Sequence, residues 1–176
     1  MSEFLTDLKE IKARARKEME QGAVTDNYKA VIKVLNQVLA TELVCVLRYR
    51  RHYYMASGLN SEAVKAEFLQ HANEEQQHAD WVATRITQLN GEPDFNPTGM
   101  ASRSASEYAT GADLVAMIRE NLIAERIAVD HYRELIRFFG QNDPATRAML
   151  ESILAVEEEH ASDMQDLLAT HGATKM

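Results

Sequence analysis

The feature that most restricts the fold of this chain is a Glu-x-x-His spacing that occurs twice, at Glu75–His78 and at Glu157–His160. One helical turn takes about 3.6 residues, so side chains three positions apart project from the same face. One such pair carries little weight, because six histidines and 27 acidic residues among 176 positions produce about one by chance. The two pairs gain weight from the residues that accompany them.

A lone glutamate precedes each pair at nearly the same distance. Glu42 lies 33 positions before Glu75, and Glu125 lies 32 positions before Glu157. The segments around the lone glutamates are also alike, and each ends in a tyrosine seven residues later: A-T-E-L-V-C-V-L-R-Y and A-E-R-I-A-V-D-H-Y. The chain therefore reads as two similar helix pairs. Four carboxylates and two imidazoles match the ligand set of a dinuclear iron or manganese centre in a four-helix bundle.

Apolar periodicity and few glycines or prolines predict an all-α protein. The expected helices span about residues 3–21, 27–56, 62–89 and 112–139, and a last helix begins at 144 with an apolar stripe that reaches Leu167 or Leu168. The link over 90–110 could extend about 65 Å, whereas a thirty-residue helix is about 45 Å long. It can therefore cross the whole bundle once. We expect a helical extension over 1–26, the bundle over 27–170 and a tail over 171–176.

The six polar residues interrupt apolar stripes in the middle of the four long helices. A buried, unpaired carboxylate costs several kcal/mol, whereas two metal ions would offset that cost. Carboxylate and imidazole ligands without thiolate suit iron or manganese and disfavour a structural zinc site. Glu75 and Glu157 are the better candidates to bridge two metals. The alternative is a bundle in which these residues make ordinary buried hydrogen bonds.

Several neighbours have simpler interpretations. Tyr49 is expected to be a packed core residue that could also hydrogen-bond a ligand beside Glu42, and Cys45 is expected to be buried. His71 and Glu74 are interpreted as facing solvent. The N-terminal helix should pack through its apolar stripe. Its lysines and arginines, offset by acids, indicate a solvated face rather than a nucleic-acid arm.

Composition excludes some classes of function. A net charge of −8 argues against nonspecific nucleic-acid binding. The single cysteine, Cys45, cannot form an internal disulfide, which fits a reducing compartment. We see no signal peptide and no run of membrane-spanning length, so a soluble, cytoplasmic protein is expected.

The segments around the six residues resemble the ferritin superfamily, and most of all bacterioferritin-type proteins. The matching segments are Leu35–Tyr49, E-E-Q-Q-H-A-D, A-E-R-I-A and E-E-E-H-A. The resemblance implies a ferritin-like bundle and a ferroxidase centre that oxidises Fe(II) with O2 or H2O2 before ferric storage in a cage. By direct match, two iron ions per subunit, with manganese or zinc as substitutes, would be held by six ligands: Glu42, Glu75, His78, Glu125, Glu157 and His160. A redox role is carried over to Tyr49.

Departures from that family bear on haem and assembly. Gln76 stands where bacterioferritins carry the haem-binding methionine, so haem is not expected by that route. The C-terminal fifth helix of the twenty-four-subunit members is not expected here, while an N-terminal helix is added and the link between the helix pairs is longer. This combination resembles the Dps-like cages that keep a bacterioferritin-type site. We therefore favour a dodecamer over a 24-mer, although the cysteine pair of that subgroup is absent. The alternatives are a di-iron or di-manganese peroxidase or oxygenase without storage, and a DNA-protecting Dps-like protein.

Overall fold

The computed structural model describes residues 8–21, 28–58 and 61–172, and every regular element within them is a helix. The helices are α1 (Leu8–Gln21), α2 (Lys29–Met55), α3 (Ser61–Gln88), α4 (Met100–Arg103), α5 (Leu114–Phe139) and α6 (Pro144–Gly172). The four long helices match the predicted ones to within a few residues. The short α4 was not predicted, and α6 extends to Gly172, about one turn past the last residues of the predicted apolar stripe. The predicted division after residue 26 falls outside the described residues.

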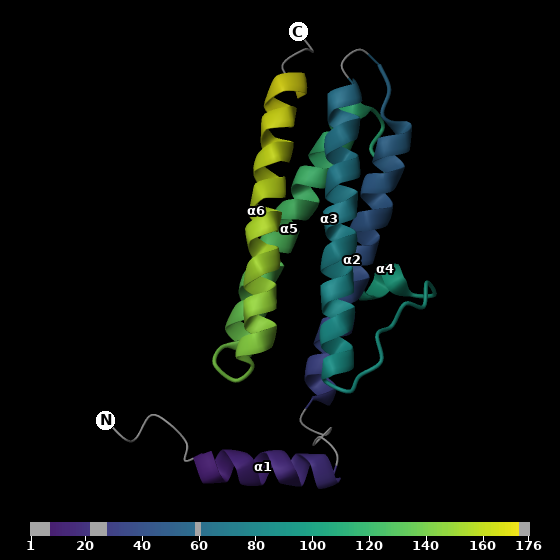
Figure 1. Cartoon of the computed structure of the whole chain (residues 1–176). Coiled ribbons are helices and arrows are strands. Elements are labelled where there is room, and N and C mark those ends of the chain that lie inside the picture. The colour runs from purple at the N-terminus through teal and green to yellow at the C-terminus, as the bar shows by residue number, and fades with distance from the viewer. Residues whose placement is uncertain (1–7, 22–27, 59–60, 173–176) are drawn as a thin grey trace, which may run out of the picture.

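Two antiparallel helix pairs form the bundle, α2 with α3 and α5 with α6 (Figure 1). Local signals start the second pair. Asp113 caps α5 by accepting the Ala116 N–H at 2.8 Å, and Asp143 caps α6 by accepting the Thr146 N–H at 3.0 Å. Asp143 also pairs with Arg85 of α3 at 2.9 Å, so this cap joins the two helix pairs.

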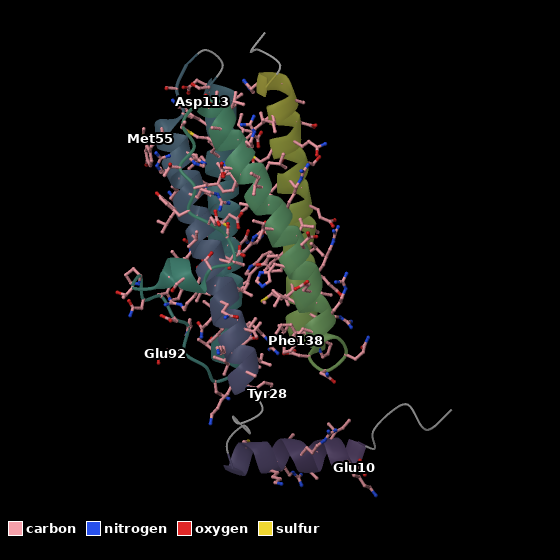
Figure 2. All side chains as sticks on the ribbon, turned by 180° about the vertical axis from the view of Figure 1, so that it is seen from behind. Glu10, Tyr28, Met55, Glu92, Asp113 and Phe138 are labelled. Atoms are coloured by element: carbon pink, nitrogen blue, oxygen red, sulfur yellow. The ribbon has the colours of Figure 1, made fainter. Side chains whose placement is uncertain are left out.

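The connection between α3 and α5 runs the length of the bundle, as expected. Glu92 and Asp113 lie near its two ends, at opposite ends of the bundle (Figure 2). Hydrogen bonds fasten it along α2 in the order of the sequence. Asn36 binds Glu92 and Asp94, Thr41 binds Ala105, Arg48 binds Ser106, and His52 contacts Ala109. This single crossover makes α3 and α5 run in the same direction.

The apolar core consists of two clusters. One is built around Leu35, Ile86 and Ile153, and the other around Phe68, Ile118 and Met164. Between the two clusters each long helix carries buried polar residues, which together form a polar layer. Because apolar packing on both sides excludes water, the polar layer between the clusters cannot satisfy its hydrogen bonds with bulk solvent.

Two expectations from the sequence do not agree with the structure. The N-terminal helix does not bury its apolar stripe against the described chain, since Ile11 is 43% exposed; Phe4 lies outside the described residues. Helix α2 is long and apolar enough to cross a membrane by length and composition alone, so the statement that no run reaches that length was wrong. Half of its apolar window is nevertheless buried in the bundle.

Candidate metal centre

All six sequence-predicted residues lie in the polar layer, and each long helix contributes. Glu42 comes from α2, Glu75 and His78 from α3, Glu125 from α5, and Glu157 and His160 from α6. None is more than 1% exposed. Each replaces an apolar residue at a core-facing helical position, so the turn of each helix directs the side chain into the core, and the packing of the four helices brings the six to one level.

The six residues form two overlapping groups that could each hold a cation. Glu42, Glu75, His78 and Glu157 offer ligand atoms within 4.8 Å of one another, and so do Glu75, Glu125, Glu157 and His160. Glu75 and Glu157 belong to both groups. The arrangement therefore gives each group one lone glutamate and one histidine of its own, with two shared carboxylates between them.

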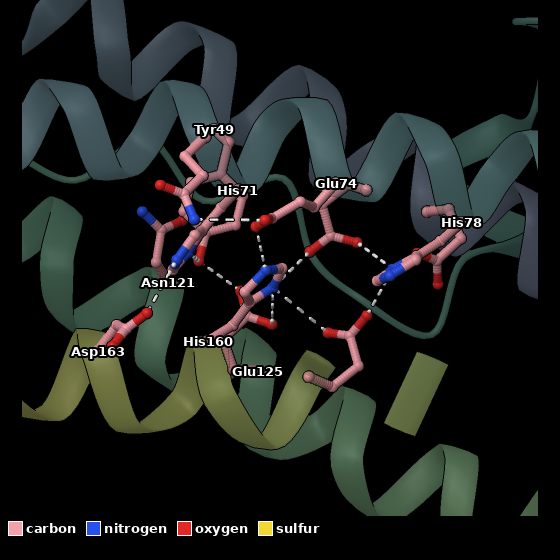
Figure 3. Close-up of polar contacts among 12 residues, drawn as sticks. Tyr49, His71, Glu74, His78, Asn121, Glu125, His160 and Asp163 are labelled. Carbon is pink, nitrogen blue, oxygen red and sulfur yellow. Dashed lines mark hydrogen bonds and ion pairs between the residues drawn. The ribbon is translucent and has the colours of Figure 1, made fainter. Parts of the chain in front are cut away.

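The histidines direct their Nδ1 atoms into the layer (Figure 3). His78 Nδ1 lies 3.0 Å from Glu157 Oε1 and 3.4 Å from Glu42 Oε2. His160 Nδ1 lies 3.6 Å from Glu75 Oε1. His160 Nε2 faces the other way and is 2.9 Å from Glu74 Oε2. This contact orients the ring and leaves Nδ1 available to the layer.

The layer contains a concentration of buried polar atoms without hydrogen-bond partners. They are Glu42 Oε2, Glu75 Oε1, His78 Nδ1, Glu125 Oε2, both Glu157 carboxylate oxygens and His160 Nδ1. Such orphaned atoms are rare in folded proteins because each carries a desolvation cost. They are all oxygen or imidazole nitrogen and they come from all six residues. A pair of iron or manganese ions fits this donor set.

The pKa values of the six residues are shifted by their burial and by the closeness of their charges. Burial, followed by repulsion from Glu75, raises the pKa of Glu42 to about 8 and raises those of Glu125 and Glu157. Burial would also raise the pKa of Glu75, but contacts with His160 and His78 lower it below its ordinary value. Carboxylate contacts overcome burial and raise the pKa of His78 to about 12 and that of His160 to about 9. Protons thus balance the metal-free layer, and a cation would displace them.

Tyrosines support the two lone glutamates in a crossed pattern. Tyr49 Oη donates to Glu125 Oε1 at 2.5 Å, and Tyr132 Oη donates to Glu42 Oε1 at 2.5 Å. Tyr49 thus hydrogen-bonds a candidate ligand, as the sequence suggested, and that ligand is Glu125 of the other helix pair rather than Glu42 of its own helix. Each tyrosine lies seven residues, or two helical turns, after the lone glutamate of its own helix. That distance places its hydroxyl beside the lone glutamate of the other helix pair instead. Tyr49 and Cys45 are buried, as predicted, and so is Tyr132.

Other buried polar residues were misjudged or missed. His71 was expected to face solvent but is fully buried, with its ring stacked on His160 at a centroid distance of 3.8 Å. Its position four residues before Glu75 places it on the same helix face, a signal that could have indicated burial. Glu74 is partly exposed. Arg48 is fully buried, donates to Asn121 at 2.9 Å and lies 3.8 Å from Glu125; no sequence pattern indicated this.

Known proteins resemble this chain over most of its length. Residues 32–171 match the family described as Ferritin-like domain. A bacterioferritin from Desulfovibrio desulfuricans is 24% identical over 143 residues, covering 81% of this chain and 76% of the relative. A nutrient stress-induced DNA-binding protein from Synechococcus sp. is 27% identical over 153 residues, covering 84% and 86%. A solved structure, the bacterioferritin-related dodecameric thioferritin of Bacteroides fragilis, has a TM-score of 0.79 at 32% identity, covering 84% of this chain and 89% of that one.

Proposed function

This chain belongs to the ferritin-like domain family, an iron-handling family, and on that premise we propose that it oxidises Fe(II) at the six-residue layer with O2 or H2O2 and stores the ferric product. The observation that carries the proposal is the meeting of orphaned carboxylate and imidazole atoms from four helices in two overlapping groups. Iron is the substrate and supplies the electrons that reduce the oxidant.

Each side chain has a proposed role that follows from its place. Glu75 and Glu157 would be shared between two Fe(II) ions because both belong to both groups. Glu42 with His78, and Glu125 with His160, would each hold one ion. The apolar clusters on either side exclude water, which strengthens the attraction between these ligands and a cation. Tyr49 is the candidate redox residue carried over from the bacterioferritin resemblance, and it lies next to the Glu125 group.

The direct test is the rate of ferric absorbance after aerobic or peroxide-driven addition of Fe(II). Glu157→Gln keeps the shape of the side chain but removes a shared charge, and we expect it to reduce the rate to near that of buffer. Glu159→Gln is the matched control, because Glu159 is exposed two residues away on the same helix. If Glu157→Gln oxidised Fe(II) as fast as Glu159→Gln, the layer would not be the ferroxidase centre.

We also propose a homo-oligomeric cage, with a dodecamer favoured over a 24-mer. The support is the similarity to the dodecameric thioferritin of Bacteroides fragilis. Sedimentation of the purified protein should give twelve times the chain mass of 19.9 kDa. A monomer or dimer would contradict storage and favour a di-metal peroxidase or oxygenase.

DNA protection is a second candidate, favoured by one observation. The Synechococcus relative is named a DNA-binding protein. Helix α1 exposes five basic side chains, which are Lys9, Lys12, Arg14, Arg16 and Lys17. A gel shift that weakens steeply with salt and is lost when these residues are replaced by glutamine would support it. The net charge of −8 opposes it, and an unchanged DNA mobility at low salt would exclude it.

A further inference from the structure

A separate group of potential ligands lies beside the six-residue layer. Glu67 and His71 of α3 and Asp163 of α6 offer ligand atoms within 4.8 Å of one another. His71 Nε2 lies 3.4 Å from Asp163 Oδ2 and 3.8 Å from Glu67 Oε2. None of the three belongs to the layer. The side chain of Asp163 is 41% exposed and that of Glu67 is 38% exposed, so this group, unlike the layer, opens to solvent.

The hydrogen bonds of Tyr49 indicate which nitrogen of His71 carries the proton. The single hydroxyl proton of Tyr49 is donated to Glu125. Tyr49 Oη is also 3.1 Å from His71 Nδ1, and with its proton already used it can only accept there. His71 Nδ1 is therefore the donor. In the neutral ring, Nε2 then carries a free lone pair.

That lone pair is buried and directed at the two carboxylates. His71 is fully buried, and its Nε2 has no hydrogen-bond partner. Figure 3 shows His71 directed toward Asp163. A lone pair facing two carboxylate oxygens is repulsive, and either a proton on Nε2 or a cation bound among the three groups relieves that repulsion. Burial and the nearby charge of Asp163 also raise the pKa of Glu67, which reflects the same unbalanced negative charge.

We propose that Glu67, His71 and Asp163 bind a third divalent cation, outside the six-residue layer. One imidazole and two carboxylates suit Fe(II), Mn(II) or Zn(II), and the exposed side of the group leaves room for water ligands. The site stands beside the Glu125 half of the layer, because His71 contacts Tyr49 and stacks on His160. It does not depend on the ferroxidase proposal, since none of its ligands belongs to the layer.

The test is Zn(II) binding, measured by competition with a coloured chelator and by elemental analysis after dialysis. The wild type should bind one more Zn(II) per chain than Asp163→Asn or Glu67→Gln does. This additional Zn(II) should bind more weakly than the ions of the layer. Loss of a supporting residue alone typically weakens metal binding about 10–100-fold, so loss of a ligand should weaken the third site at least about tenfold. Asp166→Asn is the matched control, because Asp166 is exposed one turn further along α6. Equal stoichiometry and affinity in Asp163→Asn and Asp166→Asn would overturn the proposal.

A second background separates this site from the layer. Glu157→Gln should weaken both layer positions but retain a Zn(II) that disappears in the Glu157→Gln/Asp163→Asn double variant. Anomalous scattering at the zinc edge in crystals of Glu157→Gln should place that ion among Glu67, His71 and Asp163. If Glu157→Gln bound no Zn(II), the third site would be refuted whatever the layer does. If it bound a Zn(II) that the added Asp163→Asn removed, but oxidised no Fe(II), the third site would stand and only the layer's activity would be changed.

Discussion

Removing either tyrosine hydroxyl should weaken one metal position and leave the other unchanged. Tyr132 Oη donates to Glu42 Oε1, while the Oε2 of the same carboxylate is one of the orphaned atoms of the layer. Tyr49 has the same relation to Glu125. Each hydroxyl thus fixes the orientation of one lone glutamate. Because such supporting contacts typically contribute about 10–100-fold to metal affinity, Tyr132→Phe should cost about 1.4–2.7 kcal/mol at the Glu42 position.

The measurement needs backgrounds in which one position dominates. Glu125→Gln keeps an acceptor for Tyr49 but removes the charge that would hold a metal, so Zn(II) binding, with the third site removed by Asp163→Asn, should report the Glu42 position. There, Tyr132→Phe should weaken binding about 10–100-fold, whereas Tyr49→Phe should change it by no more than about threefold, the usual limit of additivity. In the Glu42→Gln background, Tyr49→Phe should weaken Zn(II) binding about 10–100-fold and Tyr132→Phe should leave it nearly unchanged. Thermal unfolding of the metal-free variants would verify that each remains folded.

The exchange between backgrounds is the critical result. If Tyr49→Phe weakened the Glu42 position as much as Tyr132→Phe did, the crossed pairing would not control the metal positions. If neither substitution changed binding in either background, the tyrosines would be packing residues only. Either result would refute the crossed support of the two glutamates.

Three further outcomes are expected. Saturating Zn(II) at about a thousandfold over its dissociation constant should stabilise the fold by about 4 kcal/mol, and Glu157→Gln should remove most of that gain in thermal unfolding. Asp143→Ala should cost about 1–2 kcal/mol of unfolding free energy through the lost α6 cap, whereas Asp143→Asn, which can still accept, should cost less. Burial, followed by the nearby charge of Arg48, lowers the pKa of His52 to about 4, below the unfolded value of 6.5, so the unfolded chain takes up this proton first. Wild type should therefore lose stability relative to His52→Gln as pH falls from about 6.5 to about 4, and a pH-independent difference in chemical denaturation would contradict this.

Much of the fold and the composition of the layer could be predicted from the sequence because both depend on local geometry. Helical periodicity placed the four long helices to within a few residues. The same periodicity showed that Glu42, Glu75 and Glu157 interrupt apolar stripes, so their burial followed from the turn of the helix. The shared membership of Glu75 and Glu157 in both groups also followed from the repeat.

What tertiary structure decided is which residue faces which across the bundle. Glu125 is supported by Tyr49 rather than by the tyrosine of its own helix, because the packing of α2 against α5 sets that distance. His71 is buried because α6 covers it, and Arg48 is buried because the long connection covers it. Spacing along one helix cannot reveal these contacts, since they depend on the rotation and offset of neighbouring helices. The chain alone therefore determined which side chains form the layer, and the packing of the helices determined their partners.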